Sequence, residues 1–95
     1  MSLNYQRLVF SSHAVQRMFS RRISEDEVKQ VIACGEIIEE QPDDRPFPSY
    51  LILYFIDDRP FHVVFAYDKV TGTGYVVTAY IPDSNLWTDN YRKRR

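Results

Sequence analysis

A histidine and two arginines recur at intervals of four residues near the start of the chain, as His13, Arg17 and Arg21. Residues spaced by four lie above one another on one side of an α-helix, so this spacing would gather an imidazole and two guanidiniums. An imidazole can take a proton from a hydroxyl, and guanidiniums stabilise charge on phosphate oxygens. The pattern therefore indicates phosphodiester cleavage or phosphate binding, and the alternative is the ordinary basic side of a surface helix.

The stretch from Ser11 to Arg22 is expected to form the helix that holds these three side chains. Ser11 or Ser12 is the expected N-cap, which places His13 in the first turn. The apolar residues of the stretch share one stripe: Ala14, Val15, Met18 and Phe19. That stripe predicts that one side of the helix docks on a core while another presents the basic side chains.

A second set of candidate side chains lies in two later segments, with His62 in the first and Thr78 and Tyr80 in the second. In metal-free RNA cleavage the 2′-hydroxyl attacks its own phosphate, and two groups act as base and acid. His62 could be the second of these groups, after His13. The alternative is that His62 is a hydrogen-bonded structural histidine. A tyrosine can donate to a phosphate or stack on a base, or else fill a core. If residue 64 pairs with residue 78, His62 and Tyr80 share one face of the sheet, and a shift of one residue separates them.

The formal net charge of −1 hides a segregated distribution of charged residues. Residues 1–24 hold four arginines and no acid, residues 25–90 hold all thirteen acids and four bases, and residues 91–95 hold four bases. If the two ends meet in space, they make a basic patch. Arg92 and Arg94 are then candidate RNA contacts in the tail, and the alternative is a solvated end without a fixed partner.

Length and composition predict a single domain over residues 1–95 with a basic tail at about residues 91–95. Cys34 is the one cysteine, so no intrachain disulfide can form. The longest apolar run, residues 50–56, is far shorter than the ~20 residues that span a bilayer, and the first residues lack a signal-peptide pattern. A cytoplasmic protein without a membrane partner is expected. No metal or other cofactor is expected, because the histidines and the cysteine lack ligand spacing and no nucleotide-binding glycine motif is present.

Hydrophobic periodicity and turn residues predict the order β-α-α-β-β-β-β, an α+β fold with two consecutive helices on one face of a small antiparallel sheet. The second helix opens with a capping box at Ser24 and Glu27 and stops at Gly35. The expected strands are residues 5–10, 36–41, 49–56, 60–68 and 75–81. Residues 49–56 are apolar on both faces, which is typical of a central strand, and Trp87 is expected to pack against the core.

In their order along the chain, these motifs resemble the bacterial domain-of-unknown-function 4258 family. The pieces are S-x-H-A-x-x-R-M-x-x-R-x-I-S from Ser11, V-x-x-V-I-x-x-G from Val28, H-V-V from His62, T-A-Y-x-P-D from Thr78, then Trp87 and a closing R-x-R at Arg92. More distantly, that family is similar to the RelE-like toxins and ribonucleases, in which two helices pack on a small antiparallel sheet. Some RelE-like toxins act on messenger RNA in the ribosome with basic residues and a tyrosine, and ParE-like relatives act on gyrase.

Residues and resemblance together support two hypotheses. The first is a metal-independent endoribonuclease, the toxin of a toxin–antitoxin pair, whose partners are RNA and an antitoxin-like protein. Its catalytic residues would be His13, His62 and Tyr80, and its phosphate contacts Arg17, Arg21, Thr78, Arg92 and Arg94. The second is a non-enzymatic module on the same fold that binds protein or nucleic acid through the same residues. Convergence of the candidates in one concave site would favour the enzyme.

Overall fold

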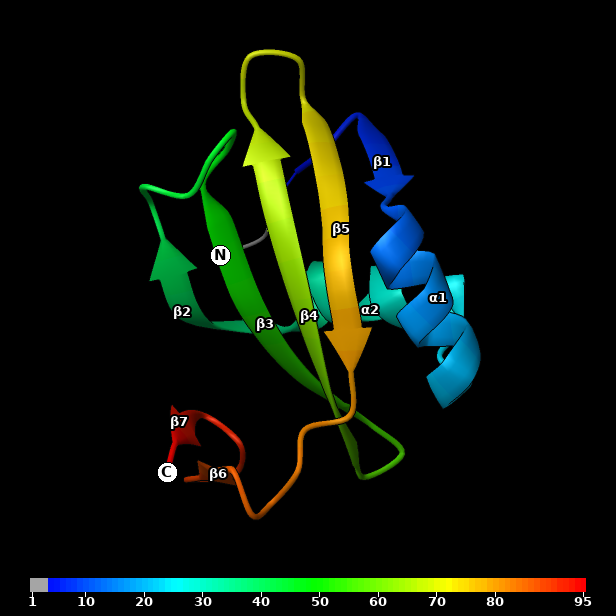
Figure 1. Cartoon of the computed structure of the whole chain (residues 1–95), viewed down its shortest axis with the longest axis vertical. Coiled ribbons are helices and arrows are strands. Elements are labelled where there is room, and N and C mark those ends of the chain that lie inside the picture. Colours follow the sequence, from blue (N-terminus) through cyan, green and yellow to red (C-terminus); the bar gives the residue numbers. More distant parts are fainter. Residues whose placement is uncertain (1–3) are drawn as a thin grey trace.

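The computed structural model describes residues 4–95, with secondary structure in the order predicted for its main sheet and helices (Figure 1). The elements are β1 (Arg7–Phe10), α1 (Ser12–Arg21), α2 (Glu25–Cys34), β2 (Glu36–Gln41), β3 (Ser49–Ile56), β4 (Arg59–Asp68), β5 (Thr73–Tyr80), β6 (Trp87–Thr88) and β7 (Lys93–Arg94). The predicted α+β fold is confirmed. The short pair β6 and β7 adds a separate antiparallel ladder near the C-terminus that the sequence had not indicated.

The main sheet has the strand order β1-β5-β4-β3-β2, and its pairs from β2 to β5 are antiparallel. β3 lies inside the sheet, as its two apolar faces predicted. β1 departs from the expected antiparallel arrangement, because it runs parallel to β5 with Leu8 opposite Gly74. Two helices and three strands separate β1 from β5 in the sequence, and such a long connection allows parallel pairing where a tight hairpin would not.

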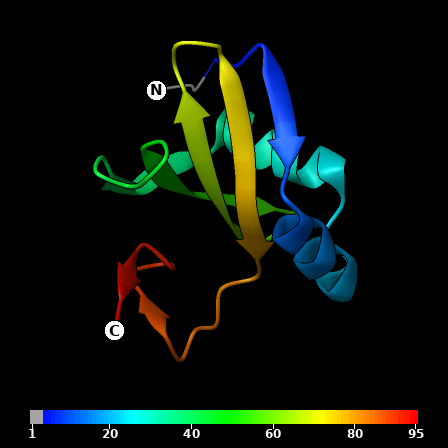
Figure 2. The ribbon, with the colours of Figure 1, turned by 45° about the horizontal axis from the view of Figure 1, so that its top comes forward.

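The two helices cover one face of the sheet and bury a shared hydrophobic core (Figure 2). α2 crosses behind β3 and β4, whereas α1 lies beside β5 at the edge of the sheet. The fully or nearly buried core residues are Ala14, Met18, Ile23, Val28, Val31, Ile32, Ile52, Phe61, Val63, Phe65, Val76 and Ala79. Each large side chain among them contributes about 1.5–3 kcal/mol of transfer free energy.

The predicted apolar stripe of α1 is only half buried. Ala14 and Met18 enter the core, but Val15 is 51% exposed and Phe19 is 87% exposed. The reason is the position of α1 at the sheet edge, where its strand neighbour is chiefly β5. A helix with one main neighbour buries a narrower stripe than a helix that crosses the middle of a sheet.

Local signals set the ends of both helices as the sequence predicted. The Ser11 side chain accepts a hydrogen bond from the backbone N–H of Ala14, at 3.0 Å, and is the N-cap of α1. Ser24 and Glu27 form the complete capping box of α2. Gly35 ends α2 in an extended conformation, and a Cβ there would lie 2.6 Å from Ile52 Cγ2 and still nearer the Val31 carbonyl. Close packing of the chain on β3 therefore requires glycine at this position.

Residues 82–95 leave β5 and turn back near the end of the sheet (Figure 1). Trp87 and the carbonyl of Tyr91 contact His62 on the sheet face opposite the helices. Trp87 is 4% exposed and therefore buried, but it packs against His62 on the face opposite the helices and not against the main hydrophobic core, where it was expected. No helix in the part of the chain that the structure describes is long and apolar enough to cross a bilayer.

Candidate functional site

The hairpin of β4 and β5 has the register that places His62 and Tyr80 on one face. Val64 pairs with Thr78 and His62 with Tyr80. One step further, Phe65 pairs with Val76, so Val77 is the extra residue of a β-bulge. The sequence had left this register open, and the structure brings the two candidate side chains together on the face opposite the helices.

The imidazole of His62 is fully buried, and both of its ring nitrogens have hydrogen-bond partners. Nε2 lies 2.9 Å from the carbonyl oxygen of Tyr91, and Nδ1 lies 3.2 Å from the hydroxyl oxygen of Tyr80. A carbonyl can only accept, so Nε2 carries the proton and Nδ1 accepts from the Tyr80 hydroxyl. The indole of Trp87 stands edge-on to the imidazole, with ring centroids 4.5 Å apart. Burial lowers the pKa of His62, although the bond to the Tyr91 carbonyl opposes that effect.

Tyr80 is half-buried and lies at the edge of a small cleft of about 150 Å³ that Glu39 and Arg94 also line. Burial raises the pKa of its phenol, and the nearby charge of Arg94 opposes the rise. The phenol is therefore neutral near pH 7, and it donates to His62. Thr78 lies on the same strand face, two residues before Tyr80, and is also half-buried.

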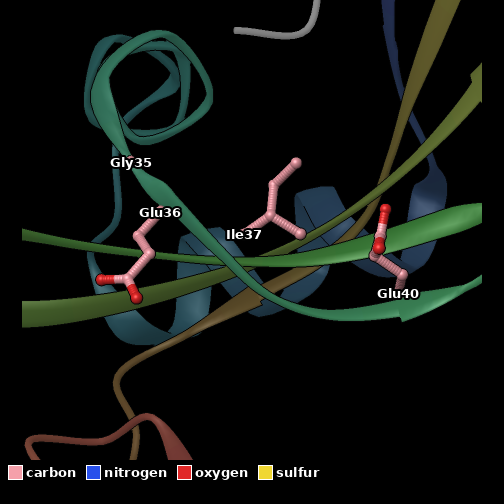
Figure 3. A pocket seen from close by; sticks show the side chains of 4 residues that line it. All are labelled: Gly35, Glu36, Ile37 and Glu40. Atoms are coloured by element: carbon pink, nitrogen blue, oxygen red, sulfur yellow. The ribbon is translucent and has the colours of Figure 1, made fainter. Parts of the chain in front are cut away.

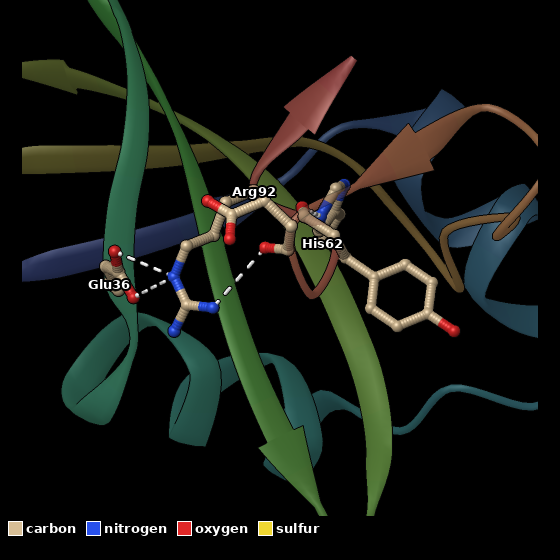
Figure 4. Close-up of polar contacts among 5 residues, drawn as sticks. Glu36, His62 and Arg92 are labelled. Atoms are coloured by element: carbon tan, nitrogen blue, oxygen red, sulfur yellow. Dashed lines mark hydrogen bonds and ion pairs between the residues drawn. The ribbon is translucent and has the colours of Figure 1, made fainter. Parts of the chain in front are cut away.

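The two candidate arginines of the tail form ion pairs with β2. Arg92 Nε lies 3.0 Å from a carboxylate oxygen of Glu36 (Figure 4). Arg94 Nε lies 3.1 Å from a carboxylate oxygen of Glu39. The guanidinium of Arg94 also covers the Trp87 ring, 4.6 Å from its centroid. These contacts hold the C-terminal segment against the sheet above His62, and they leave both arginines with an intramolecular partner.

The first-helix candidates lie at a different place from the buried pair. His13, Arg17 and Arg21 are all exposed on α1, which packs on β5, whereas the tail arginines contact β2 at the other side of the sheet (Figures 1 and 2). Within residues 4–95, no carboxylate lies within ion-pair distance of either α1 arginine. The candidate residues therefore divide into an exposed basic side of α1 and a buried set under the C-terminal segment.

Two hollows on the surface were not indicated by the sequence. One, of about 500 Å³, lies where α2 meets β2 and is lined by Gly35, Glu36, Ile37 and Glu40, with the two carboxylates on either side of Ile37 (Figure 3). The other, of about 520 Å³, lies on the sheet face opposite the helices, beside the loop of residues 42–48. We call it the sheet-face cleft. Its apolar lining is Pro46, Phe47, Val64, Ala66, Tyr75 and Val77, and its polar lining is Asp44, Arg45 and Ser49.

The sheet-face cleft is shaped by the proline-rich loop. The rings of Phe47 and Tyr75 stack, with centroids 5.5 Å apart and planes 5° from parallel, and this contact fixes the loop to β5. The three prolines of residues 42–48 marked a loop but not its direction, so its partner could not be read from the sequence. Among residues 4–95, no three His, Cys, Asp or Glu side chains are grouped so that they could hold a metal ion.

Comparison with known proteins gives one family. Residues 10–81 match the model of a domain of unknown function, DUF4258, from the end of β1 to just after β5. Trp87, Arg92 and Arg94 lie outside the matched residues. No curated protein and no solved structure matches the chain. Since the match covers most of the 95 residues, the chain belongs to the DUF4258 family.

Proposed function

We propose that this protein is a nucleic-acid-binding module that holds RNA through the basic side of α1, without cleaving it. The observation that carries the proposal is the state of His13, Arg17 and Arg21. All three are exposed along one side of a helix that contains no acidic residue, and neither arginine is in an ion pair within residues 4–95.

The side chains of His13, Arg17 and Arg21 are suited to binding phosphate groups. A guanidinium donates two parallel hydrogen bonds to phosphate oxygens, and successive side chains four residues apart are separated by about 6 Å along the helix. A flexible single strand can place neighbouring phosphates along such a row. A protein partner could bind at the same place. An acidic, antitoxin-like protein would present carboxylates, instead of phosphates, to the same guanidiniums.

The positions of the two histidines favour binding over cleavage. Proton transfer to and from a ribose and its phosphate needs both groups within hydrogen-bond reach of one substrate. His13 is exposed on α1, whereas His62 is buried with both ring nitrogens hydrogen-bonded. A binding role needs neither a second histidine nor an accessible imidazole.

A RelE-like, metal-independent endoribonuclease is the second candidate function. It is favoured by the surroundings of Tyr80, whose hydroxyl bonds to His62 while its ring lines a cleft beside Arg94. A phosphate in that cleft would have to displace Glu39 from Arg94 to meet the guanidinium, and it would then lie beside the phenol, with the imidazole behind the phenol as the proton acceptor.

The binding proposal is tested by fluorescence anisotropy of a labelled single-stranded RNA at several salt concentrations. Each phosphate contact to single-stranded nucleic acid contributes about 0.7 to the slope of log affinity against log salt. Arg17→Ala and Arg21→Ala are each expected to weaken binding and to flatten that slope by about this amount. Lys69→Ala removes one positive charge from the exposed turn after β4 and should leave binding unchanged. Equal effects of all three variants, or no binding by wild type, would contradict the proposal.

The same samples separate binding from cleavage. RNA incubated with the protein and a chelator is analysed by gel, and under the binding proposal its length does not change. Shortening by wild type that is lost in His13→Ala or Tyr80→Phe would instead support the ribonuclease.

A further inference from the structure

We propose that copies of this chain associate head to tail, with the apolar side of α1 of one copy seated in the sheet-face cleft of the next. The proposal concerns a different side of α1 from the one that would hold RNA. It rests on the exposure of Val15 and Phe19, on the lining of the cleft and on the opposite charges that border the two surfaces.

The apolar side of α1 consists of Val15 and Phe19, which are four residues apart and therefore neighbours on the helix. Phe19 is 87% exposed, and a phenyl ring in water next to a second apolar side chain is a typical contact residue. At about 100° per residue, these two lie on one flank of the buried residues Ala14 and Met18. His13 and Arg17 lie on the opposite flank, so the two sides of the helix can act independently.

The sheet-face cleft offers a matching cavity. Its volume of about 520 Å³ lies within the range of about 300–1,000 Å³ that is usual for ligand sites. The small side chains of Val64 and Ala66 form part of its lining, together with the stacked rings of Phe47 and Tyr75. An aromatic side chain of a partner could pack against such rings with offset or edge-to-face geometry.

The charges around the two surfaces are complementary. Asp44 lines the cleft and Asp43 precedes it, whereas Glu36 and Glu39 of β2 are already paired with Arg92 and Arg94. Arg45 is the one base in the lining. On the other surface, Arg22 follows Phe19 by three residues, is exposed, and caps a helix without acids. A second copy would therefore bring a guanidinium to the acidic side of the cleft while its phenyl ring enters it.

The two surfaces are distinct patches on one molecule, so their contact is heterologous. A heterologous contact leaves a free cleft at one end and a free helix at the other, and further copies add unless the chain closes into a ring. The contact area is small, which predicts weak association that rises with protein concentration.

The test is the mass of the protein in solution, measured by sedimentation and light scattering at protein concentrations up to about 1 mM. Concentrations in this range detect association with a dissociation constant as weak as about 1 mM. A reducing agent is present because Cys34 is exposed. Wild type is expected to gain mass with concentration beyond the dimer or to reach a closed ring, and added salt should reduce the gain. Phe19→Ser should abolish it, whereas Val70→Ser, which removes an equally exposed apolar side chain from a turn, should not.

A mixing experiment identifies the pairing. Ala66→Arg fills the cleft with a charged side chain that repels Arg22, and this variant alone should be monomeric. Mixed with Phe19→Ser, it should give a one-to-one heterodimer and nothing larger, because one variant keeps the helix and the other keeps the cleft. If Ala66→Arg fails to fold by circular dichroism, Phe47→Ala, which removes one ring from the lining, replaces it.

Three results would overturn the proposal: a wild type that stays monomeric, association that survives Phe19→Ser, or a mixture that forms no heterodimer. RNA binding is measured separately on Phe19→Ser, so the outcome for self-association does not depend on the outcome for RNA.

Discussion

The buried imidazole of His62 predicts that the protein loses stability in mildly acidic solution. Burial lowers the pKa of this histidine below its ordinary value of 6.5. As the pH falls through 6.5, the unfolded chain takes up a proton at this residue while the folded chain does not. Because the unfolded state then binds more protons, the free energy of unfolding decreases as the pH decreases, from 6.5 down to the lowered pKa of the folded state.

The size of the effect follows from the single proton involved. One proton difference changes the free energy of unfolding by at most about 1.4 kcal/mol per pH unit. A domain of this size has a total stability of about 5–15 kcal/mol, so a loss of this size over one unit is readily measured. Urea denaturation at pH 7.5, 6.5 and 5.5, followed by tryptophan fluorescence, measures it directly, since Trp87 lies against the imidazole.

Two variants separate His62 from the other titrating groups. His62→Gln keeps one amide donor and one carbonyl acceptor at the site but has no proton to gain, so its stability should be nearly independent of pH between 7.5 and 5.5. His13→Gln removes a histidine that is exposed in the folded chain and should keep the wild-type slope. The reasoning fails if wild type and His62→Gln show the same slope, or if wild type becomes more stable on acidification.

Three further substitutions test the contacts that hold the fold, each by urea denaturation at pH 7.5. Gly35→Ala should lower the free energy of unfolding by about 1–3 kcal/mol, because its Cβ would collide with α2 and β3; an unchanged midpoint would show that the chain can shift there. Ser24→Ala should cost about 1 kcal/mol through loss of the capping box, and Ser20→Ala, elsewhere on the helical surface, should cost much less. Trp87→Ala should cost about 3–5 kcal/mol. Repeated at pH 5.5, it should also show a flatter pH dependence, because water then reaches His62; circular dichroism follows its unfolding, since Trp87 is the one tryptophan.

The features that could be predicted from the sequence are those set by near neighbours in the chain. The capping box of Ser24 and Glu27 involves residues three apart, and the Ser11 cap likewise bonds within one turn. The apolar alternation of residues 49–56 on both faces indicated an interior strand, and β3 is one. The helix caps depend on hydrogen bonds between near neighbours in the chain. The interior position of β3 is indicated by the apolar pattern of that one strand.

The features that could not be predicted depend on which distant segments meet. Nothing near β1 specifies that it pairs parallel with β5. The register of His62 with Tyr80 depends on the bulge at Val77, and the four-residue turn of residues 69–72 is compatible with more than one alignment. The partner of the His62 Nε2 proton is a backbone carbonyl, that of Tyr91, and every residue in the chain has such a carbonyl.

The arrangement of charge follows from the strand order. Both chain ends are basic, but the order β1-β5-β4-β3-β2 puts three inter-strand spacings, about 14 Å, between the strand that α1 packs on and the strand that binds the tail. Arg92 and Arg94 are neutralised there by Glu36 and Glu39. Those ion pairs keep the C-terminal segment over His62, so the charge of these two arginines contributes to closing the sheet face rather than to an open surface. A polyanion bound along α1 would therefore meet the basic side of the helix without them, and its affinity should be insensitive to Arg92→Ala.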